Sequence, residues 1–325
     1  MVAAEPRPVL VATEAADVTA DMVIDRLNQR GVPVVRFDPA DMADGELTVT
    51  ARFGAGDAPV TGWLRTPSRR VALENARSVY WRRPVWPAYE HLGDADAQFA
   101  AAQTRFGLGG VLHALEGCLW LNHPLRNLAA DYKPHQLAVA RRMGLTTAPT
   151  VVTNDPDVAR EFITAYGQVV YKTLRWTPYE RGGTAMTSWA DLVSADEVDE
   201  SIRVAPHLFQ ARVDKQADVR VLVVGRRVFA VRIDSDLLDW RRDYSALSYR
   251  VIDLPVALSK TLLAYLEHFG LPSGSFDMAL GRDGAFHWLE LNPNGQWGFL
   301  EEGTGLDMAG AFADLLAQGG RDVAV

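Results

Sequence analysis

The chain has 325 residues, 48% of them hydrophobic and 23% charged, and carries a net charge of −8 at pH 7. A chain of this length can bury a large core and favours two or three compact units over one. The acidic balance excludes the broad basic surface on which nucleic-acid binding depends. We see no apolar run of membrane-spanning length and no secretory leader, so we expect a cytoplasmic protein with no membrane or nucleic-acid partner.

Strand-like and helical patterns alternate through the first third of the chain, which predicts an open α/β layer with mostly buried strands. Strands are expected at 8–12, 34–37, 47–53, 60–64, 79–83 and 119–122, and helices at 18–30 and 95–116. Gly31 directly follows the first helical pattern and marks its end.

The pattern changes near residue 126. Helices are expected at 133–143 and 155–166, and strands at 150–153 and 168–174. Residues 175–184 carry two glycines, two arginines and no apolar periodicity, which predicts a mobile loop. The last third is rich in strand patterns, at 207–213, 218–224, 227–234, 275–280 and 285–291, with helices at 257–269 and 308–318.

Two acids lie in a predicted hairpin near the C-terminus. Two strand patterns flank Asp283-Gly284, a dipeptide favoured in two-residue hairpin turns. In such a hairpin, residues whose numbers sum to 567 face each other, so Asp277 lies opposite Glu290 and Asn292 shares their face. The Cβ atoms of the two acids would be about 4.5–5.5 Å apart. A three-residue turn would break this register.

Facing carboxylates in an apolar hairpin repel each other, and burying them without partners is costly. A hard divalent cation removes both penalties, and two carboxylates with an amide oxygen suit Mg²⁺ far better than Zn²⁺. We therefore predict that Asp277, Glu290 and Asn292 hold Mg²⁺. The alternative is that one acid pairs with an arginine, or that both acids face water.

Phosphates and water usually complete the shell of a Mg²⁺ ion that has few protein ligands. The chain lacks the P-loop and dinucleotide-binding glycine motifs. Lys172 ends an apolar strand, and Lys133 begins a helix, where the dipole favours anions. Either lysine could instead be a solvated surface residue. Only four of the 33 basic residues are lysine, and this scarcity favours a need for a compact ammonium group at these two positions.

Arg220 and Arg232 belong to neighbouring predicted strands joined through Gly225. If the turn brings them to one face, two guanidinium groups would converge on an oxyanion or phosphate. The sequence does not determine the turn length, so each arginine could instead pair with a nearby acid such as Asp218 or Asp234.

Six phrases of the sequence form a recognisable set. They are Asp17-Val18-Thr19-Ala20-Asp21, Tyr80-Trp81-Arg82-Arg83-Pro84, Tyr132-Lys133-Pro134, Val170-Tyr171-Lys172, Asp218-Val219-Arg220 and Glu290-Leu291-Asn292-Pro293-Asn294-Gly295-Gln296-Trp297. Together they resemble the ATP-grasp superfamily over essentially the whole chain. More closely, the chain resembles the graspetide synthetases, the maturases of microviridin-like ribosomal peptides, in their actinobacterial-type subfamily.

The resemblance implies an α/β chain with the ATP-grasp fold. An N-terminal pre-ATP-grasp α/β domain would span 1–125, and two α+β domains that clasp ATP would follow, a central subdomain at 126–205 and a C-terminal subdomain at 206–325. ATP and Mg²⁺ would be the cofactors. The resemblance assigns the metal to the same Asp277, Glu290 and Asn292 as the hairpin argument.

The resemblance also implies roles for the basic groups. Phosphates would be held by the two lysines under a closing loop at 175–184, and adenine would bind an interdomain hinge at 210–213, where Ala211 replaces the glutamate common in relatives. The implied nucleotide-binding residues are Lys133, Lys172, Gln210, Ala211, Arg212, Val213, Lys215 and Asp218. Lys172, Arg220 and Arg232 would act on the transferred phosphate and the acceptor carboxylate.

The implied enzyme is an ADP-forming ATP-dependent ligase. It would phosphorylate Asp or Glu side chains of a ribosomal precursor peptide, with a leader and an acidic core, and join the acyl phosphate to Ser or Thr hydroxyls or Lys amines. The resemblance also suggests a homodimer. Three alternatives stay open: a ligase that joins an amine or amino acid to a small carboxylate, an aspartimide-forming peptide maturase, and a non-catalytic binding protein on the same fold.

Overall fold

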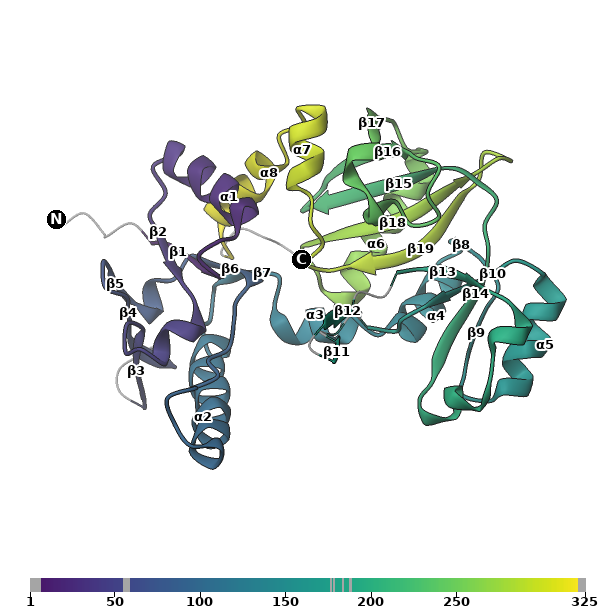
Figure 1. Cartoon of the computed structure of the whole chain (residues 1–325). Coiled ribbons are helices and arrows are strands. Elements are labelled where there is room, and N and C mark those ends of the chain that lie inside the picture. The colour runs from purple at the N-terminus through teal and green to yellow at the C-terminus, as the bar shows by residue number, and fades with distance from the viewer. Residues whose placement is uncertain are drawn as a thin grey trace. The chain divides into compact units, whose positions relative to one another are not determined.

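The computed structural model describes residues 7–54, 59–175, 177, 179–182, 184–186 and 189–320 (Figure 1). Contacts divide the chain into two compact units. The first unit contains Met1–Pro124, Gln296–Glu302 and Leu306–Val325, and the second contains Leu125–Gly295 and Gly303–Gly305. The three-domain division expected at 125 and 205 stays a prediction, and the last part of the chain groups with the N-terminal part.

A four-stranded parallel sheet lies at the centre of the first unit, in the order β2-β1-β6-β7. Its strands are β1 (Val9–Thr13), β2 (Val34–Phe37), β6 (Ser78–Arg83) and β7 (Leu119–Leu121). The unit also contains helices α1 (Val18–Gln29), α2 (Asp94–His113) and α8 (Met308–Gln318). Strand β1 is buried along its whole length, as its unbroken apolar sequence predicts. The expected open α/β layer is confirmed.

A second, antiparallel sheet in the first unit has three strands, β3 (Thr48–Phe53), β4 (Val60–Arg65) and β5 (Arg70–Ala72). Its inner face contributes Leu64 and Val71 to a core shared with β1, β2 and α2. Gly62 in β4 has φ +148°, and a Cβ there would lie 1.9 Å from the carbonyl oxygen of Thr50. Only glycine therefore allows β3 and β4 to approach this closely.

A six-stranded sheet dominates the second unit. Its order is β17 (Ser248–Val251), β16 (Arg227–Asp234), β15 (Lys215–Val224), β18 (Ser273–Gly281), β19 (Phe286–Asn292) and β8 (Thr146–Thr147). All neighbours are antiparallel except β19 and β8. Helices α4 (Lys133–Arg142) and α6 (Val256–Phe269) bury one face of this sheet, where Tyr265 meets Phe276 and Trp288.

A smaller antiparallel sheet of the second unit has the order β13 (Asp191–Val193), β10 (Val169–Lys172), β14 (His207–Ala211) and β9 (Thr150–Thr153). Helix α5 (Pro156–Tyr166) packs on it through Ala159 and Ile163. The short helices α3 (Pro124–Ala130) and α7 (Gly298–Thr304) were not expected from the sequence pattern. Among the described residues, no helix is both long and apolar enough to span a bilayer.

The expected mobile loop at 175–184 is partly wrong. Strands β11 (Tyr179–Arg181) and β12 (Thr184–Met186) form an antiparallel pair in and beyond this segment. Gly182, with φ +59°, lies in the turn between them. A strand of three residues is too short to show an apolar alternation, which is why the pattern gave no strand here. Residues 176, 178 and 183 lie outside the described residues.

Candidate active site

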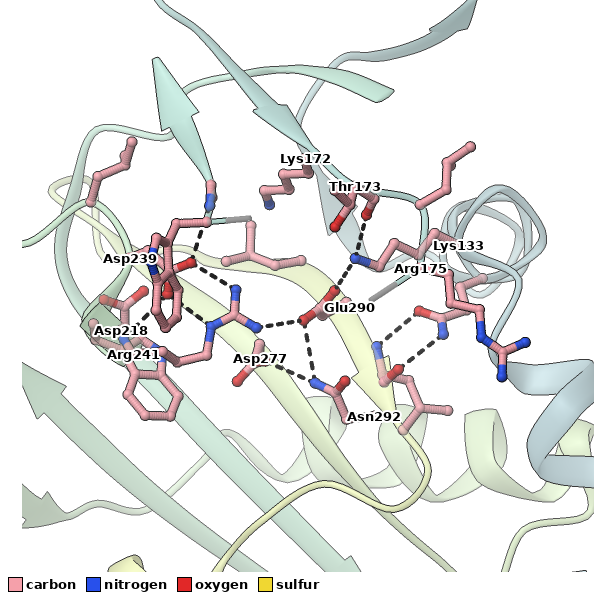
Figure 2. Close-up of a pocket in the computed structure, with 18 of the residues that line it drawn as sticks. Lys133, Lys172, Thr173, Arg175, Asp218, Asp239, Arg241, Asp277, Glu290 and Asn292 are labelled. Carbon is pink, nitrogen blue, oxygen red and sulfur yellow. Dashed lines mark hydrogen bonds and ion pairs between the residues drawn. The ribbon is translucent and has the colours of Figure 1, made fainter. Parts of the chain in front are cut away.

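A cavity of about 570 Å³ in the second unit is lined by residues from both of its larger sheets (Figure 2). The lining includes charged side chains of both signs. The lysines and arginines are Lys133, Lys172, Arg175, Lys215 and Arg241, and the acids are Asp131, Asp218, Asp239, Asp277 and Glu290. A cavity of this size with both signs of charge suits a ligand that carries anionic groups together with a cation.

The β18–β19 hairpin brings the predicted acids face to face. Asp277 pairs with Glu290, as the sequence predicts. The predicted two-residue turn is wrong, however. Ala285 accepts a 2.9 Å hydrogen bond from the Gly281 amide, which closes a three-residue loop, and Leu280 pairs with Phe286. The register then shifts between Asp277 and Met278, and this shift restores the predicted pairing.

The register shift is a β-bulge at Leu289, and it decides which face Glu290 takes. Met278 pairs with Trp288, and both are buried in the core on the helix side of the sheet. Trp288 and Glu290 are two residues apart, so a regular strand would place both on that side. The extra residue reverses the alternation and lets Glu290 share the cavity face with Asp277.

Gln136 of α4 binds the backbone of β19 at Leu291, between the predicted metal ligands Glu290 and Asn292. Its side-chain amide donates to the carbonyl oxygen of Leu291 at 2.9 Å and accepts from the Leu291 amide at 2.9 Å. Gln136 is 1% exposed, and the Tyr265 hydroxyl donates to the backbone carbonyl oxygen of Gln136 at 2.9 Å. The carboxamide thus takes the place of a neighbouring strand and satisfies both backbone groups of Leu291, which lies between Glu290 and Asn292.

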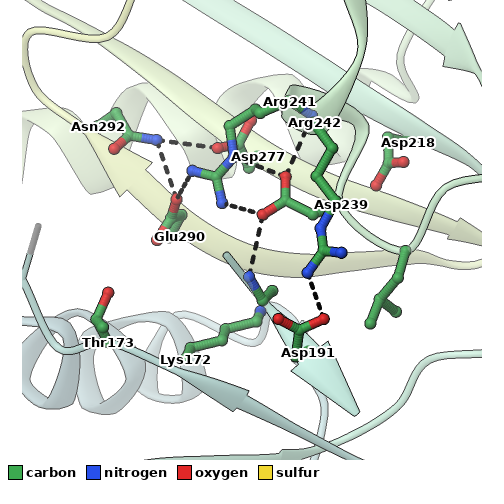
Figure 3. Close-up of polar contacts among 12 residues, drawn as sticks. Lys172, Thr173, Asp191, Asp218, Asp239, Arg241, Arg242, Asp277, Glu290 and Asn292 are labelled. Atoms are coloured by element: carbon green, nitrogen blue, oxygen red, sulfur yellow. Dashed lines mark hydrogen bonds and ion pairs between the residues drawn. The ribbon is translucent and has the colours of Figure 1, made fainter. Parts of the chain in front are cut away.

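The facing acids are held by cations and by an amide, and Figure 3 shows Arg241 beside Glu290 and Asn292 between Glu290 and Asp277. The Arg220 guanidinium lies 2.6 Å from Asp277, and the Lys133 ammonium lies 3.0 Å from Glu290. Asn292 donates its amide nitrogen to Asp277 at 2.9 Å and to Glu290 at 3.3 Å. Burial by itself would raise the pKa of Glu290, but Lys133, Arg241 and Lys172 together outweigh it and hold that pKa well below its ordinary value.

The donor set at the hairpin fits Mg²⁺. Among the described residues there is no cluster of three or more His, Cys, Asp or Glu side chains that could hold a metal ion. Asp277, Glu290 and the amide oxygen of Asn292 are hard oxygen donors, and an incomplete set suits an ion whose other ligands are phosphates and water. The pairing of an acid with an arginine, the alternative reading of the sequence, describes Asp277 and Arg220 in this structure.

Both predicted phosphate lysines line the cavity, and Figure 2 shows them near Thr173. Lys133 also donates to the carbonyl oxygen of Thr173 at 2.9 Å. Lys172 donates to the side-chain oxygen of Gln210 at 2.8 Å. Burial lowers the pKa of the Lys172 ammonium to about 8, although Glu290 opposes the shift.

Further charged residues of the cavity pair among themselves. Lys215 lies 2.5 Å from Asp218, and burial raises the pKa of Asp218 to about 6 despite this partner. Asp239 binds Arg241 through two hydrogen bonds of 2.8 Å, one to Nε and one to Nη2. Arg241 also lies 3.6 Å from Glu290. No sequence pattern singles out Asp239 or Arg241, because 29 arginines lie scattered among many acids.

Some predicted residues do not meet at the cavity. Arg220 pairs with Val231, whereas Arg232 pairs with the buried Val219, so the two arginines lie on opposite faces of the sheet. The suggested convergence of Arg220 and Arg232 is therefore wrong, because a two-residue turn sets a register that separates them. Arg232 instead binds Asp234 at 2.6 Å.

The predicted adenine hinge is not part of the cavity lining. Its residues are Gln210, Ala211, Arg212 and Val213, and the cavity is lined by none of them. The Ala211 amide donates to the Pro149 carbonyl at 2.9 Å, and the Arg212 amide donates to the Gln168 carbonyl at 2.8 Å. Adenine binding by this segment stays a prediction.

Solved structures match nearly the full chain, whereas no protein-family model and no curated protein matches it. The macrocyclase MdnB from Microcystis aeruginosa MRC is 30% identical, with a TM-score of 0.80 over 97% of this chain and 100% of its own. A RiPP-associated ATP-grasp ligase from Chryseobacterium gregarium, solved with ADP and a leader and core peptide, is 26% identical, with a TM-score of 0.87 over 95% of this chain and 96% of its own.

The macrocyclase MdnC from Microcystis aeruginosa MRC, solved with the precursor peptide MdnA, is 24% identical and supports the fold, with a TM-score of 0.86 over 96% of this chain and 100% of its own. The predicted ATP-grasp fold is thus confirmed. Because the match to MdnB extends over nearly the whole of this chain, the chain belongs to the graspetide synthetases, the ATP-grasp ligases that macrocyclise ribosomal peptides.

Proposed function

We propose that this chain macrocyclises a ribosomal precursor peptide at the expense of ATP. The γ-phosphoryl group of ATP passes to a side-chain carboxylate of Asp or Glu in the peptide, and ADP is released. A Ser or Thr hydroxyl or a Lys amine of the same peptide then attacks the acyl phosphate. Inorganic phosphate leaves, the attacking group loses its proton, and an ester or amide closes the ring with the net loss of one water.

The facing pair of Asp277 and Glu290 in a cavity with several cations carries this proposal. Two acids and an amide are presented by the rigid β18–β19 hairpin, and Lys133, Lys172 and Arg241 surround them. Phosphoryl transfer needs little covalent help from the protein, and depends on positioning and charge stabilisation. This arrangement provides both, and the family to which the chain belongs carries out the same class of reaction.

In this proposal, Asp277, Glu290 and Asn292 hold Mg²⁺, which would neutralise developing charge on phosphate oxygens. Lys133 and Lys172 bind the phosphates of ATP. Arg220 orients Asp277 through its 2.6 Å contact and is retained as a group near the transferred phosphate. No protein nucleophile is required, so the enzyme's remaining task is to keep water from the acyl phosphate.

Lys215, Asp218 and the segment 210–213 also bind the nucleotide in this proposal, as the family resemblance implies. We further propose that the enzyme works in the cytoplasm, where ATP is available, as a homodimer, and that it belongs to the actinobacterial-type subfamily. Its peptide substrate would carry a leader and a core rich in Asp or Glu with Ser, Thr or Lys. The Chryseobacterium relative was solved with a leader and core peptide, which supports a substrate of this organisation.

The test is the intact mass of a candidate precursor, encoded beside the gene, after incubation with the enzyme, ATP and Mg²⁺. We expect the loss of one water per ring, with one ADP formed per event. Tandem mass spectrometry then distinguishes an ester from an amide or an imide. ADP formation with unchanged peptide would instead favour a ligase for small carboxylates. If a folded enzyme forms neither ADP nor a dehydrated peptide, the result would count against macrocyclisation of that peptide.

A further inference from the structure

The outer face of the β3–β4–β5 sheet is rich in arginine. The register places Arg65 between Thr48 and Arg70 in one row across the three strands, and Trp63 between Thr50 and Ala72 in the next. Arg52 lies in the third row. The opposite face carries Leu64 and Val71 into the core, so these rows lie on the face turned away from it. We call Arg52, Trp63, Arg65 and Arg70 the Arg–Trp face.

The Arg–Trp face concentrates positive charge on a protein of net charge −8. Arg52, Arg65 and Arg70 are all exposed. None of the three forms an ion pair with an acid within the part of the chain that the structure describes, whereas most other arginines of the first unit bind an acid or a backbone carbonyl. The three arginine side chains of this face are therefore exposed and have no acidic partner among the described residues.

Trp63 holds two of these guanidinium groups in place. The Arg70 guanidinium carbon lies 4.1 Å from the Trp63 ring centroid, and that of Arg52 lies 4.8 Å from it. A guanidinium that stacks on an indole keeps its N–H donors in the plane of the group, free to bind a carboxylate with two hydrogen bonds. Because the stacking restricts the side chains before any ligand arrives, less conformational entropy is lost on binding.

We infer that the Arg–Trp face is a docking surface for an acidic segment of the peptide substrate, separate from the cavity of the second unit. The inference rests on the proposed function, which requires a peptide that carries Asp or Glu. Carboxylates are the natural partners of arginines held in this way. The flat three-stranded face suits an extended peptide, whereas the net charge of −8 would repel a nucleic acid from the molecule as a whole.

A direct test uses a fluorescein-labelled peptide of alternating glutamate and threonine, with binding measured by fluorescence anisotropy. ADP and Mg²⁺ are present in excess, so that binding of the acidic peptide in the cavity is suppressed. We expect the variant Arg52→Gln with Arg70→Gln to bind the peptide about tenfold more weakly, and the wild-type affinity to fall with added salt. Equal affinities of wild type and variant would overturn the inference.

The matched control is Arg142→Gln with Arg226→Gln, which removes the same charge from two exposed arginines of the second unit. This control should bind as wild type does. An equal loss in the control would show that net charge alone governs binding and would overturn the inference. So would a single-stranded oligonucleotide of the same net charge that bound the Arg–Trp face more tightly than the peptide.

Turnover of the precursor separates this inference from the proposed function. In the Arg52→Gln, Arg70→Gln variant we expect the KM for the precursor to rise about tenfold, with kcat and the KM for ATP unchanged. Ring formation with an unchanged KM for the precursor would overturn the docking surface and leave the function standing. No ring formation by the wild type, together with arginine-dependent binding of the labelled peptide, would overturn the function and leave an acidic-peptide surface.

Discussion

At the residue scale, Lys133 and Lys172 meet the cost of burial in different ways. Lys133 has a carboxylate partner, Glu290, at 3.0 Å. Lys172 has the neutral amide of Gln210 as its hydrogen-bond acceptor, and burial lowers its pKa to about 8. Lys172 has no carboxylate within ion-pair distance among the described residues, so a phosphate would stabilise its ammonium group more than that of Lys133.

Nucleotide binding should take up a proton at alkaline pH. The pKa of Lys172 in the protein without nucleotide is about 8, compared with an ordinary value of 10.5. Between these two pH values, most Lys172 side chains are therefore neutral amines before the nucleotide binds. Phosphate oxygens beside it would favour the charged form and raise the pKa, so a proton must be bound with the nucleotide. We expect the heat of ADP binding in this pH range to depend on the ionisation enthalpy of the buffer.

Calorimetry of two variants checks the assignment. Lys172→Met should abolish the dependence on the buffer, whereas Lys260→Met, which changes an exposed lysine of α6, should preserve it. A binding heat independent of the buffer in the wild type would mean that Lys172 does not approach the phosphates.

Loss of either facing carboxylate should reduce ATP turnover. Removal of a group that merely orients a metal ligand typically costs about 10–100-fold, so Asp277→Asn and Glu290→Gln should each lower kcat by roughly 100-fold or more. Asp283→Asn, in the exposed turn of the same hairpin, is the control and should retain wild-type turnover. Full turnover by either site variant, measured as ADP release at saturating Mg²⁺, would refute the metal assignment.

The sequence was informative at this scale where geometry is simple. The pairing of Asp277 with Glu290 was predicted from regular strand alternation, and it holds because the bulge at Leu289 offsets the longer turn. The contribution of Gln136 could not be predicted, since it depends on how α4 lies against the edge of β19. Nor could Arg241, whose position depends on a short 3₁₀ turn, Trp240–Arg242, begun by Asp239.

At the element scale, two departures from a regular hairpin compensate each other. The three-residue turn shifts the register of β19 by one, and the bulge at Leu289 shifts it back. The facing pair was thus predicted correctly from a turn that is wrong in detail. Turn length and bulges depend on local backbone strain and on which side chains pack in the core, here Trp288. The pattern of polar and apolar residues alone therefore does not predict them.

The edge of β19 offers a prediction about Gln136. Gln136→Met keeps the side chain's length but leaves the amide and carbonyl of Leu291 buried without partners, a cost of about 1–3 kcal/mol for each group. We expect a lowered melting temperature and an apparent affinity for Mg²⁺ reduced about 10–100-fold, because Glu290 and Asn292 flank Leu291. Both are read from Mg²⁺ titrations of ATP turnover and from thermal unfolding.

Gln103→Met is the control for this prediction, because Gln103 is an exposed glutamine of α2 in the first unit. It should leave both quantities unchanged. A Gln136→Met enzyme with lowered stability but the wild-type requirement for Mg²⁺ would show that Gln136 supports the fold without positioning the ligands.

Long elements were predicted well, and short ones were not. The helix at 308–318 and the strand at 227–234 have the bounds expected from their patterns. The strands β5, β8 and β13 have two or three residues each, and helix α3 has seven. Such segments contain no more than about two repeats of the pattern that would reveal them, and tertiary packing decides their conformation.

At the scale of the whole molecule, the end of the chain completes the first unit. Phe312 of α8 is 4% exposed, and its ring stacks on Trp297 at 4.9 Å between centroids and lies 5.6 Å from Tyr80 of β6. The side chain of Gln296 accepts hydrogen bonds from Thr19, at 3.1 Å, and from Arg82. Three of the six phrases that carry the family resemblance therefore meet inside the first unit.

Phe312→Ala should destabilise the first unit by about 3–5 kcal/mol, the usual cost of truncating a buried phenylalanine. Phe106→Ala removes the same atoms from a side chain that is 80% exposed on α2, and should change the stability by no more than about 0.5 kcal/mol. Chemical denaturation followed by tryptophan fluorescence measures both. Similar effects of the two substitutions would contradict the packing described for α8.

The chain returns to the first unit at Gln296, so the two parts of this unit, Met1–Pro124 and the segments after Gly295, leave the ribosome at different times. At about 5–20 residues per second, the segment from Leu125 to Gly295 takes on the order of 10–30 s to emerge. During that interval the nascent N-terminal segment lacks α8. The apolar surface that α8 later covers is therefore exposed and accessible to chaperones. The second unit, made almost entirely in one continuous stretch, can fold first although it is encoded second.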